Sequence, residues 1–323
     1  MTALLRLDDL NVSFATPRGQ LRAVRSVSIE LKPGESLGVV GESGSGKTVL
    51  SRATMGLLPS TATRTGTIEY QGQDISGWPK DKVRELWGIG MAMIFQDPMT
   101  ALNPVRRIGA QVTESLTVRL GMDKKAARAR AVELLKRVRI PDPEATLKKF
   151  PYQLSGGMRQ RIMIAIAVSC NPELLFADEP TTALDVTVQA QVLELLDELR
   201  KEYNMAMILV THDLGVVAGH TDKIAVMYAG DLVEYAPTGE LFANMKMPYT
   251  EALLKSIPRL DTPTGARLLV IEGRMPDPTK DEPGCAFAGR CPYVQDKCLS
   301  EKPPLVDGGN NLFYRCWYPI GGK

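Results

Sequence analysis

The eight residues from Gly41 to Thr48, GESGSGKT, constrain this chain more than any other part of its sequence. They fit the pattern G-x-x-x-x-G-K-[ST] and lie between a short apolar run and a segment with helical periodicity. Glycines let such a loop wrap closely around phosphates, and the following helix presents its positive N-terminal end to them. We therefore predict that Lys47 reaches the β- and γ-phosphates of a nucleotide and that Thr48 binds Mg²⁺. The loop residues expected to contact the nucleotide are Gly41, Glu42, Ser43, Gly44, Ser45, Gly46, Lys47 and Thr48.

Short apolar runs, bounded by polar or turn residues, alternate with helical segments along much of the chain. Such runs suit strands that helices cover on both faces. The segment Val186–Tyr203 carries apolar residues at helical spacing, so it predicts an amphipathic helix. The pattern predicts an α/β fold with a mainly parallel sheet. The predicted strands are Ser36–Gly41, Met91–Phe95, Leu174–Ala177, Met205–Val210 and Ile224–Tyr228.

The 323 residues favour two domains. Helix-rich sequence such as Lys124–Ile140 and Met158–Cys170 predicts a helical subdomain, at about residues 97–170, inserted into the α/β core. After Pro258 the sequence becomes rich in proline, glycine and aspartate, and periodicity fades. We therefore expect a nucleotide-binding domain over residues 1–257 and a small irregular domain over residues 258–323.

The charge and the apolar runs exclude several classes of protein. A net charge of +2 gives no sign of a nucleic-acid binder, because such proteins neutralise phosphates with basic groups. The longest apolar run, Ile162–Val168, is far shorter than the roughly 20 residues needed to cross a bilayer. Residues 1–14 lack the pattern of a signal peptide. We expect a protein that is neither exported nor integral, and that reaches a membrane only through a partner.

Two acidic residues, Asp178 and Glu179, follow the predicted strand Leu174–Ala177. An acid at the C-terminal end of a strand in such a sheet lies beside the ligand crevice. Taken alone, two acids after a strand are usually part of a solvated loop. Beside a phosphate-binding loop, we interpret Asp178 as a Mg²⁺ ligand and Glu179 as the general base that polarises the attacking water.

The heptapeptide Leu154–Gln160, LSGGMRQ, closely resembles the signature motif of ABC ATPases. Ser155 can cap the helix that it precedes, while Gly156 and Gly157 let backbone N–H groups approach a γ-phosphate. The alternative, a flexible turn before an apolar helix, suits Ser-Gly-Gly but not the whole heptapeptide. The resemblance implies the P-loop NTPase fold of ABC ATPases, ATP hydrolysis, and two subunits that enclose the nucleotide head to tail.

Other motifs of the family follow in its usual order. By this resemblance, Gln96 matches the Gln-loop, Asp185 in Thr182–Asp185 matches the D-loop that touches the opposite subunit, and His212 matches the switch histidine. Phe14 matches the aromatic residue that stacks on adenine. The implied catalytic residues are Glu179, His212, Lys47 and Gln96. The implied Mg²⁺ ligands are Thr48, Gln96 and Asp178, and the implied nucleotide contacts outside the phosphate loop are Phe14, Ser155, Gly156, Gly157 and Asp185.

Three longer stretches, residues 95–104, 177–189 and 284–292, look like those of the oligopeptide and dipeptide importer ATPases. This resemblance implies a peripheral protein at the cytoplasmic face of the membrane that drives peptide uptake. The implied partners are a second, related ATPase in a heterodimer, two membrane-spanning permease subunits and an extracytoplasmic solute-binding protein. Alternatives are the same motor for nickel or another small solute, a soluble ABC ATPase of DNA repair or translation, and a small P-loop kinase or nucleotide switch.

Four of the five cysteines, Cys285, Cys291, Cys298 and Cys316, lie in the C-terminal domain. A reducing cytosol disfavours disulfides, and the spacing matches neither zinc ribbons nor the ferredoxin run. Four thiols in a segment poor in apolar residues favour a four-thiolate metal site over unligated cysteines. Cys170 lies in an apolar helix, so we interpret it as an unligated cysteine that packs as a small apolar residue. The importer resemblance favours a [4Fe–4S] cluster over zinc, with a structural or regulatory role.

Overall fold

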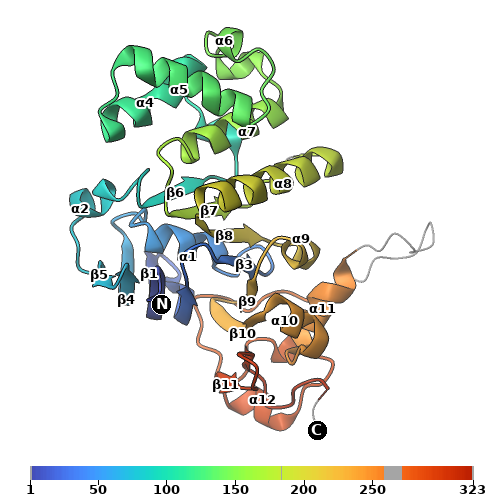
Figure 1. The fold of residues 1–323 in the computed structure, drawn as a ribbon. Coiled ribbons are helices and arrows are strands. Elements are labelled where there is room, and N and C mark those ends of the chain that lie inside the picture. Colours follow the sequence, from blue (N-terminus) through green and yellow to red (C-terminus); the bar gives the residue numbers. More distant parts are fainter. Residues whose placement is uncertain (1, 183, 258–270, 322–323) are drawn as a thin grey trace. The chain divides into compact units, whose positions relative to one another are not determined.

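The computed structural model describes residues 2–182, 184–257 and 271–321. The chain forms two compact units (Figure 1). The first unit comprises Met1–Lys32, Ser36–Gly77 and Leu209–Lys323, and the second comprises Pro33–Glu35 and Trp78–Ile208. Within the first unit, the structure describes residues 271–321 of the predicted C-terminal domain but not its first residues, 258–270. The predicted boundary at residue 258 thus lies outside the described residues.

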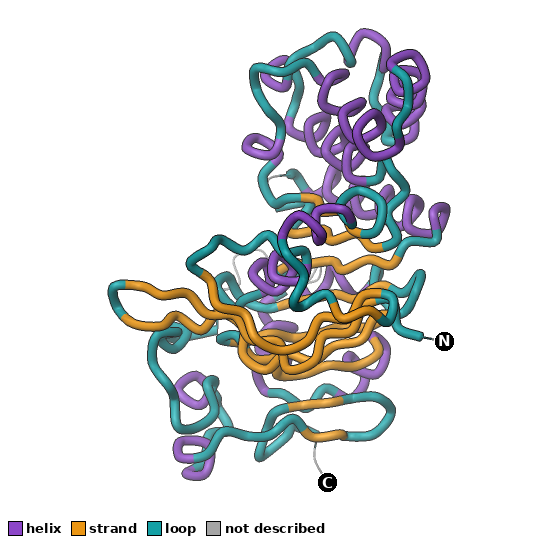
Figure 2. The backbone as a smooth tube through the Cα atoms, turned by 90° about the vertical axis from the view of Figure 1, so that its left-hand side faces the viewer, coloured by secondary structure: helices purple, strands orange, loops and turns teal. Residues whose placement is uncertain are grey.

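The first unit contains a layer of antiparallel strands that the sequence analysis missed. Strand β1 (Leu5–Thr16) pairs with β2 (Gly19–Leu31) and with β4 (Ala62–Tyr70), and the short β5 (Gln73–Asp74) pairs with β4. Figure 2 shows the long strands of this unit side by side. Exposed and buried residues alternate over much of β1 and β2, so these strands lack the continuous apolar runs by which the other strands were found. The prediction of a mainly parallel sheet is therefore wrong for this unit, whose sheet is mixed.

Strand β3 (Ser36–Val40) occupies the interior of the first unit and leads into the phosphate loop. All five of its residues are buried, and it pairs in parallel with β9 (Lys223–Tyr228), which in turn pairs antiparallel with β10 (Asp231–Pro237). Helix α1 (Lys47–Thr54) begins at the last two residues of the predicted loop. The strand, loop and helix expected around Gly41–Thr48 are thus confirmed.

The described C-terminal residues pack onto the core of the first unit. Strand β12 (Phe313–Tyr314) extends the sheet by pairing with β10. Phe287 is 1% exposed and lies 5.3 Å, between ring centroids, from both Tyr228 and Tyr249. The segment therefore shares an existing core. The remaining elements of this unit are α9 (Leu214–Ala218), α10 (Thr238–Asn244), α11 (Pro248–Ser256), η2 (Ala288–Arg290), α12 (Asp296–Ser300) and β11 (Val306–Asp307).

The second unit combines two parallel strands with a set of helices. Strand β6 (Met91–Ile94) pairs with β7 (Leu174–Asp178), and both are buried throughout, as their apolar sequences predict. Helix α8 (Val186–Tyr203) has the bounds read from its periodicity. The other helices, which include those of residues 97–170, are α2 (Lys80–Glu85), α3 (Pro98–Ala101), α4 (Ile108–Leu120), α5 (Lys124–Arg137), α6 (Pro143–Thr146), η1 (Pro151–Gln153) and α7 (Gly156–Ala167).

Strand β8 (Ala206–Thr211) is the point at which the chain passes from the second unit back to the first. All six of its residues are buried, which agrees with the apolar run predicted as a strand. Across the described parts of the chain, none of the helices has both the length and the apolar character that a membrane span requires.

Candidate nucleotide-binding site

Two glycines of the phosphate loop occupy positions where a side chain does not fit. Gly41 has φ +153°, and a Cβ atom added to it would lie 2.1 Å from the backbone oxygen of Met227. Gly46 has φ +102°, and its added Cβ would lie 2.2 Å from the backbone oxygen of Ala23. Real Cβ atoms do not approach carbonyl oxygens so closely, so the turn of this loop against its neighbouring strands depends on glycine.

Lys47 places its ammonium group inside the loop. The residue is only 4% exposed, and its Nζ donates hydrogen bonds to the carbonyl oxygens of Gly41 (2.7 Å) and Glu42 (2.9 Å). The hydroxyl of Ser45 is buried and has no hydrogen-bond partner among the described residues. A buried cation and an unsatisfied buried hydroxyl, at the N-terminus of the eight-residue helix α1, suit an anionic ligand. Thr48 is half-buried in the first turn of α1.

The other predicted site residues of the first unit are Phe14 and His212. Phe14 is half-buried in β1, where it pairs with Leu21 of β2 and Ala62 of β4. His212 is exposed and directly follows β8, and the next residue, Asp213, caps α9 through a 2.7 Å bond from the Gly215 amide. Phe14 thus lies within the sheet, whereas the His212 imidazole is accessible to a ligand.

In the second unit, the structure brings Gln96 and Glu179 together. The side-chain amide of Gln96, Nε2, donates to Oε2 of Glu179 at 2.9 Å. The hydroxyl of Thr182 donates to the same oxygen at 2.8 Å, a contact that the sequence analysis did not foresee. Glu179 has φ +45°, a left-handed conformation that is uncommon outside glycine and occurs at functional turns. Asp178, at the end of β7, is fully buried.

The signature heptapeptide forms the N-terminus of α7, as predicted. The Ser155 hydroxyl accepts a 3.3 Å hydrogen bond from the Met158 amide, so its capping role is confirmed. An added Cβ at Gly156 would meet no atom within 4 Å, whereas one at Gly157 would lie 3.2 Å from Val188 of α8. This end of the helix is therefore open on the side of Gly156.

Asp185 has a local role that the motif match did not include. Its carboxylate accepts a 3.0 Å hydrogen bond from the Val188 amide and caps α8. The side chain itself is exposed, so the cap leaves it accessible. Ala183 of the predicted D-loop lies outside the described residues.

Known protein families match both parts of the sequence. Residues 24–182 match the family described as "ABC transporter", and residues 233–298 match "Oligopeptide/dipeptide transporter, C-terminal region". The oligopeptide transport ATP-binding protein OppD of Salmonella typhimurium is 45% identical over 317 residues, which cover 98% of this chain and 94% of the relative. The chain belongs to the ATP-binding subunits of oligopeptide and dipeptide ABC transporters.

Other members of this family and a solved structure agree with the assignment. The dipeptide transport ATP-binding protein DppD of Bacillus subtilis is 46% identical over 319 residues, which cover 98% of this chain and 95% of the relative. The ATP-binding cassette MJ0796, solved as a dimer in a post-hydrolysis state with ADP and Pi, matches with a TM-score of 0.66 and 25% identity. That match covers 72% of this chain and 98% of the solved chain. The fold is therefore that of ABC ATPases.

The four C-terminal cysteines of this transporter ATPase form no disulfide and line one small pocket. The pocket volume is about 20 Å³, room for about one water molecule. Burial raises the pKa of the Cys285 and Cys291 thiols, and raises that of Cys316 to about 11. A metal ion that bound here would have to displace these protons, because it coordinates the thiolate.

The structure does not show the metal site that the sequence predicted. Within residues 2–182, 184–257 and 271–321, no three His, Cys, Asp or Glu side chains are arranged to hold a metal ion. The prediction rested partly on the idea that a C-terminal segment poor in apolar residues needs a metal to hold it together. The described residues are also held by the aromatic contacts of Phe287 and by sheet pairing, which the sequence analysis did not foresee.

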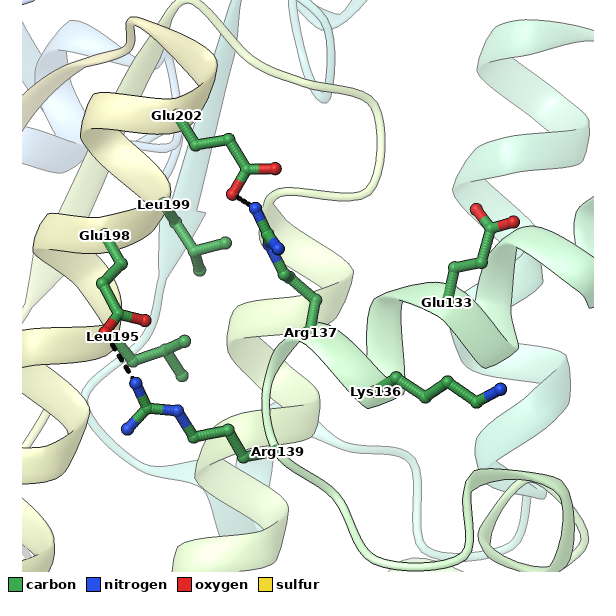
Figure 3. Close-up of a pocket in the computed structure, with 8 residues that line it drawn as sticks. All are labelled: Glu133, Lys136, Arg137, Arg139, Leu195, Glu198, Leu199 and Glu202. Atoms are coloured by element: carbon green, nitrogen blue, oxygen red, sulfur yellow. Dashed lines mark hydrogen bonds and ion pairs between the residues drawn. The ribbon is translucent and has the colours of Figure 1, made fainter.

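A hollow of about 710 Å³ lies between α5 and α8 of the second unit (Figure 3). Arg139 pairs with Glu198 at 2.6 Å and with Glu194 at 3.8 Å, and Arg137 pairs with Glu202. These groups are partly exposed, and such pairs contribute at most about 1 kcal/mol each. The hollow is therefore a salt-bridged surface between two helices and is not part of the nucleotide site.

Proposed function

We propose that this chain is the ATP-hydrolysing subunit of a peptide importer and that it works at the cytoplasmic face of the membrane. The observation that carries the proposal is the phosphate loop with the buried Lys47, in a chain that belongs to the transporter ATPases. The pairing of Gln96 with Glu179 adds the groups that such an ATPase needs to act on water. Residues 1–257 would form the nucleotide-binding domain and residues 258–323 the importer-type domain.

In this proposal the phosphate loop binds ATP, and Phe14 stacks on the adenine. The Lys47 ammonium would exchange its two backbone oxygens for phosphate oxygens, which carry more negative charge. Thr48, Asp178 and Gln96 would hold Mg²⁺, which neutralises charge on the phosphates when it is bound. Hydroxyl, carboxylate and amide oxygens are the hard ligands that this ion prefers.

Glu179 would act as the general base and His212 would contact the γ-phosphate. The same Glu179 oxygen accepts hydrogen bonds from both Gln96 and Thr182, which fix the direction of its carboxylate. Phosphoryl transfer depends mainly on positioning and charge, so a fixed carboxylate is what the reaction requires of the protein. A carboxylate held in a fixed direction is positioned to act as the general base for the attacking water.

A second, related ATPase would complete the site. The N-terminus of α7, with Ser155, Gly156 and Gly157, would cover the nucleotide of the neighbouring subunit, and Asp185 would contact that subunit. The open side of Gly156 and the exposure of Asp185 support this role. A related cassette was solved as a dimer with ADP and Pi, which supports a paired arrangement.

Two permease subunits and an extracytoplasmic solute-binding protein would complete the transporter. We infer that the permeases dock on the coupling surface, which we define as Phe95, Met99 and Val105. All three are exposed apolar side chains within nine sequence positions of Gln96; Met99 is 61% exposed and Val105 is 80% exposed. Several exposed apolar side chains in one short segment are consistent with a surface that a partner covers. The cargo is selected by the permeases and the binding protein, so peptide transport rests on family membership.

Replacing Met99 and Val105 together by Asp should abolish peptide uptake by the reconstituted transporter. ATP binding by the isolated chain should stay within about twofold, because both side chains point away from the core. The matched control is Val118→Asp on α4, which changes a side chain of similar exposure (71%) outside the surface. Normal uptake by the double variant, measured with a labelled peptide in proteoliposomes, would contradict the docking role.

An iron–sulfur cluster in the C-terminal domain stays a proposal. It is supported by the four free cysteines around one pocket. The pocket would have to widen and the thiols to ionise, so binding would rearrange this segment. Protein purified without oxygen should be brown and contain about four irons per chain. Colourless protein without iron, or with one zinc per chain, would contradict the cluster.

A further inference from the structure

The second residue of the phosphate loop, Glu42, is held by an arginine from the C-terminal segment. The guanidinium of Arg290 donates from Nη1 to Oε2 of Glu42 at 2.7 Å and from Nη2 to Oε1 at 2.9 Å. The Arg290 side chain is 6% exposed and the Glu42 side chain is 27% exposed. A two-pronged ion pair that is largely shielded from water is both directional and strong. It joins residues 248 positions apart in the sequence.

Arg290 is itself fixed on every side of its guanidinium. Its Nε donates to the backbone oxygen of Glu272 at 2.9 Å, and Nη2 also donates to the backbone oxygen of Ile271 at 2.9 Å. Nη1 lies 3.3 Å from the Tyr228 hydroxyl. The hydrogen bonds to Glu42 raise the pKa of Arg290 above its ordinary value. Little freedom is left to the group, so it can act as a rigid support for Glu42.

Glu42 is also fixed through its backbone, beside the phosphate-binding lysine. Its amide donates to the hydroxyl of the buried Tyr249 at 2.8 Å, and its carbonyl accepts from the Lys47 ammonium at 2.9 Å. Glu42 thus links the ion pair with Arg290 to a backbone carbonyl that contacts Lys47. Tyr249 packs on Phe287, which lies three residues before Arg290, so both supports involve the C-terminal segment.

A second contact of the same segment reaches the loop. A Cβ atom added to Gly44 would lie 3.2 Å from the terminal methyl carbon of Met275. The backbone of Pro278 further accepts a 3.0 Å hydrogen bond from the amide of Arg22 in β2. Met275 thus lies close to the phosphate loop, and Pro278 ties the same segment to strand β2.

We propose that Arg290 is a positioning residue of the phosphate loop, which holds Glu42 so that the loop keeps its phosphate-binding conformation. The C-terminal segment then sets the nucleotide affinity of the ATPase through one ion pair. The inference rests on the proposed ATP-binding function. An isolated Glu42 carboxylate, without its partner, would be left partly buried beside the site of an anion, which would weaken phosphate binding further.

The test measures the dissociation constant for Mg-ATP and the melting temperature of the full chain. Arg290→Gln and Glu42→Gln should each raise the dissociation constant about tenfold or more. The dissociation constant of the double variant should not exceed that of the weaker-binding single variant, because both substitutions remove the same ion pair. The dissociation constant of Arg290→Lys should lie between those of the wild type and Arg290→Gln, because lysine keeps the positive charge but cannot donate two parallel hydrogen bonds to the carboxylate. If Arg290→Gln does not fold, Glu42→Gln tests the pair from the loop side.

The matched control is Lys302→Gln, which removes a different ion pair between the C-terminal segment and the core. Lys302 contacts the buried Asp231 at 2.7 Å, an ion pair that includes no residue of the phosphate loop. This variant should melt at a lower temperature than the wild type, and its dissociation constant for Mg-ATP should stay within about twofold of the wild-type value. The proposal is overturned if folded Arg290 and Glu42 variants bind Mg-ATP as the wild type does. A wild-type chain that does not bind Mg-ATP would instead overturn the proposed function, and the inference with it.

Discussion

The Glu179→Gln variant is expected to hydrolyse ATP about 10²- to 10⁴-fold more slowly than the wild type while it still binds Mg-ATP. The substitution keeps the size of the side chain and an oxygen that can accept from Gln96 and Thr182. It removes the carboxylate that would take a proton from the attacking water. The measurement is steady-state phosphate release, together with Mg-ATP affinity, on the subunit in its assembled transporter.

The control for this prediction is Glu198→Gln, which removes an exposed carboxylate of α8 that pairs with Arg139. Its phosphate release should stay close to that of the wild type, because the pair lies on a surface outside the site. Phosphate release by the Glu179 variant within a few-fold of the wild type would show that another group activates the water. The assignment of Glu179 would then be wrong.

Gly41→Ala is expected to abolish measurable nucleotide binding. The added methyl group would lie 2.1 Å from the Met227 carbonyl oxygen and 2.8 Å from the Ser45 hydroxyl, and the residue would keep a φ of +153° that L-residues avoid. The loop can relieve this clash only by moving away from β9. A displacement of about 1 Å can reduce such a site's performance about 100-fold. Mg-ATP titration and the melting temperature measure the two effects separately.

The variant Gly72→Ala introduces backbone strain without a steric clash, so it serves as the control for Gly41→Ala. Gly72 also has a positive φ, +75°, but a Cβ added there would meet no atom within 4 Å. This variant should lose about 1 kcal/mol of stability and bind Mg-ATP normally. If Gly41→Ala binds nucleotide as tightly as Gly72→Ala does, the loop does not need the conformation described here.

The parts of the fold that could be predicted from the sequence are those with a strong local signal. The buried strands β3, β6, β7, β8 and β9 are continuous apolar runs, and α8 is a long amphipathic helix, so pattern alone located them. The strands β1, β2 and β4 were missed because their alternating residues, with exposed positions and register shifts, look like ordinary polar sequence. The local sequence pattern identifies strands that are buried on both faces better than strands that are buried on only one face.

The candidate site likewise contains features that the sequence predicts and features that it does not. The phosphate loop and the Ser155 cap follow from residues adjacent in sequence, and their geometry agrees with the motifs. The pairing of Arg290 with Glu42 joins distant residues, and no short motif signals it. Arg290 lies in the stretch 284–292 that resembles the importer ATPases, directly before Cys291. Packing of the C-terminal segment on the core, rather than its composition, decides what holds it in place.

In the proposed transporter, a γ-phosphate is bound between the phosphate loop of one subunit and the α7 N-terminus of another. The most direct test is the mass in solution of the Glu179→Gln variant mixed with its companion ATPase, which carries the equivalent substitution. We predict a two-subunit complex at saturating Mg-ATP that is absent with ADP and is lost when Ser155→Arg is added. Single subunits only, with the companion and saturating Mg-ATP both present, would contradict the claim.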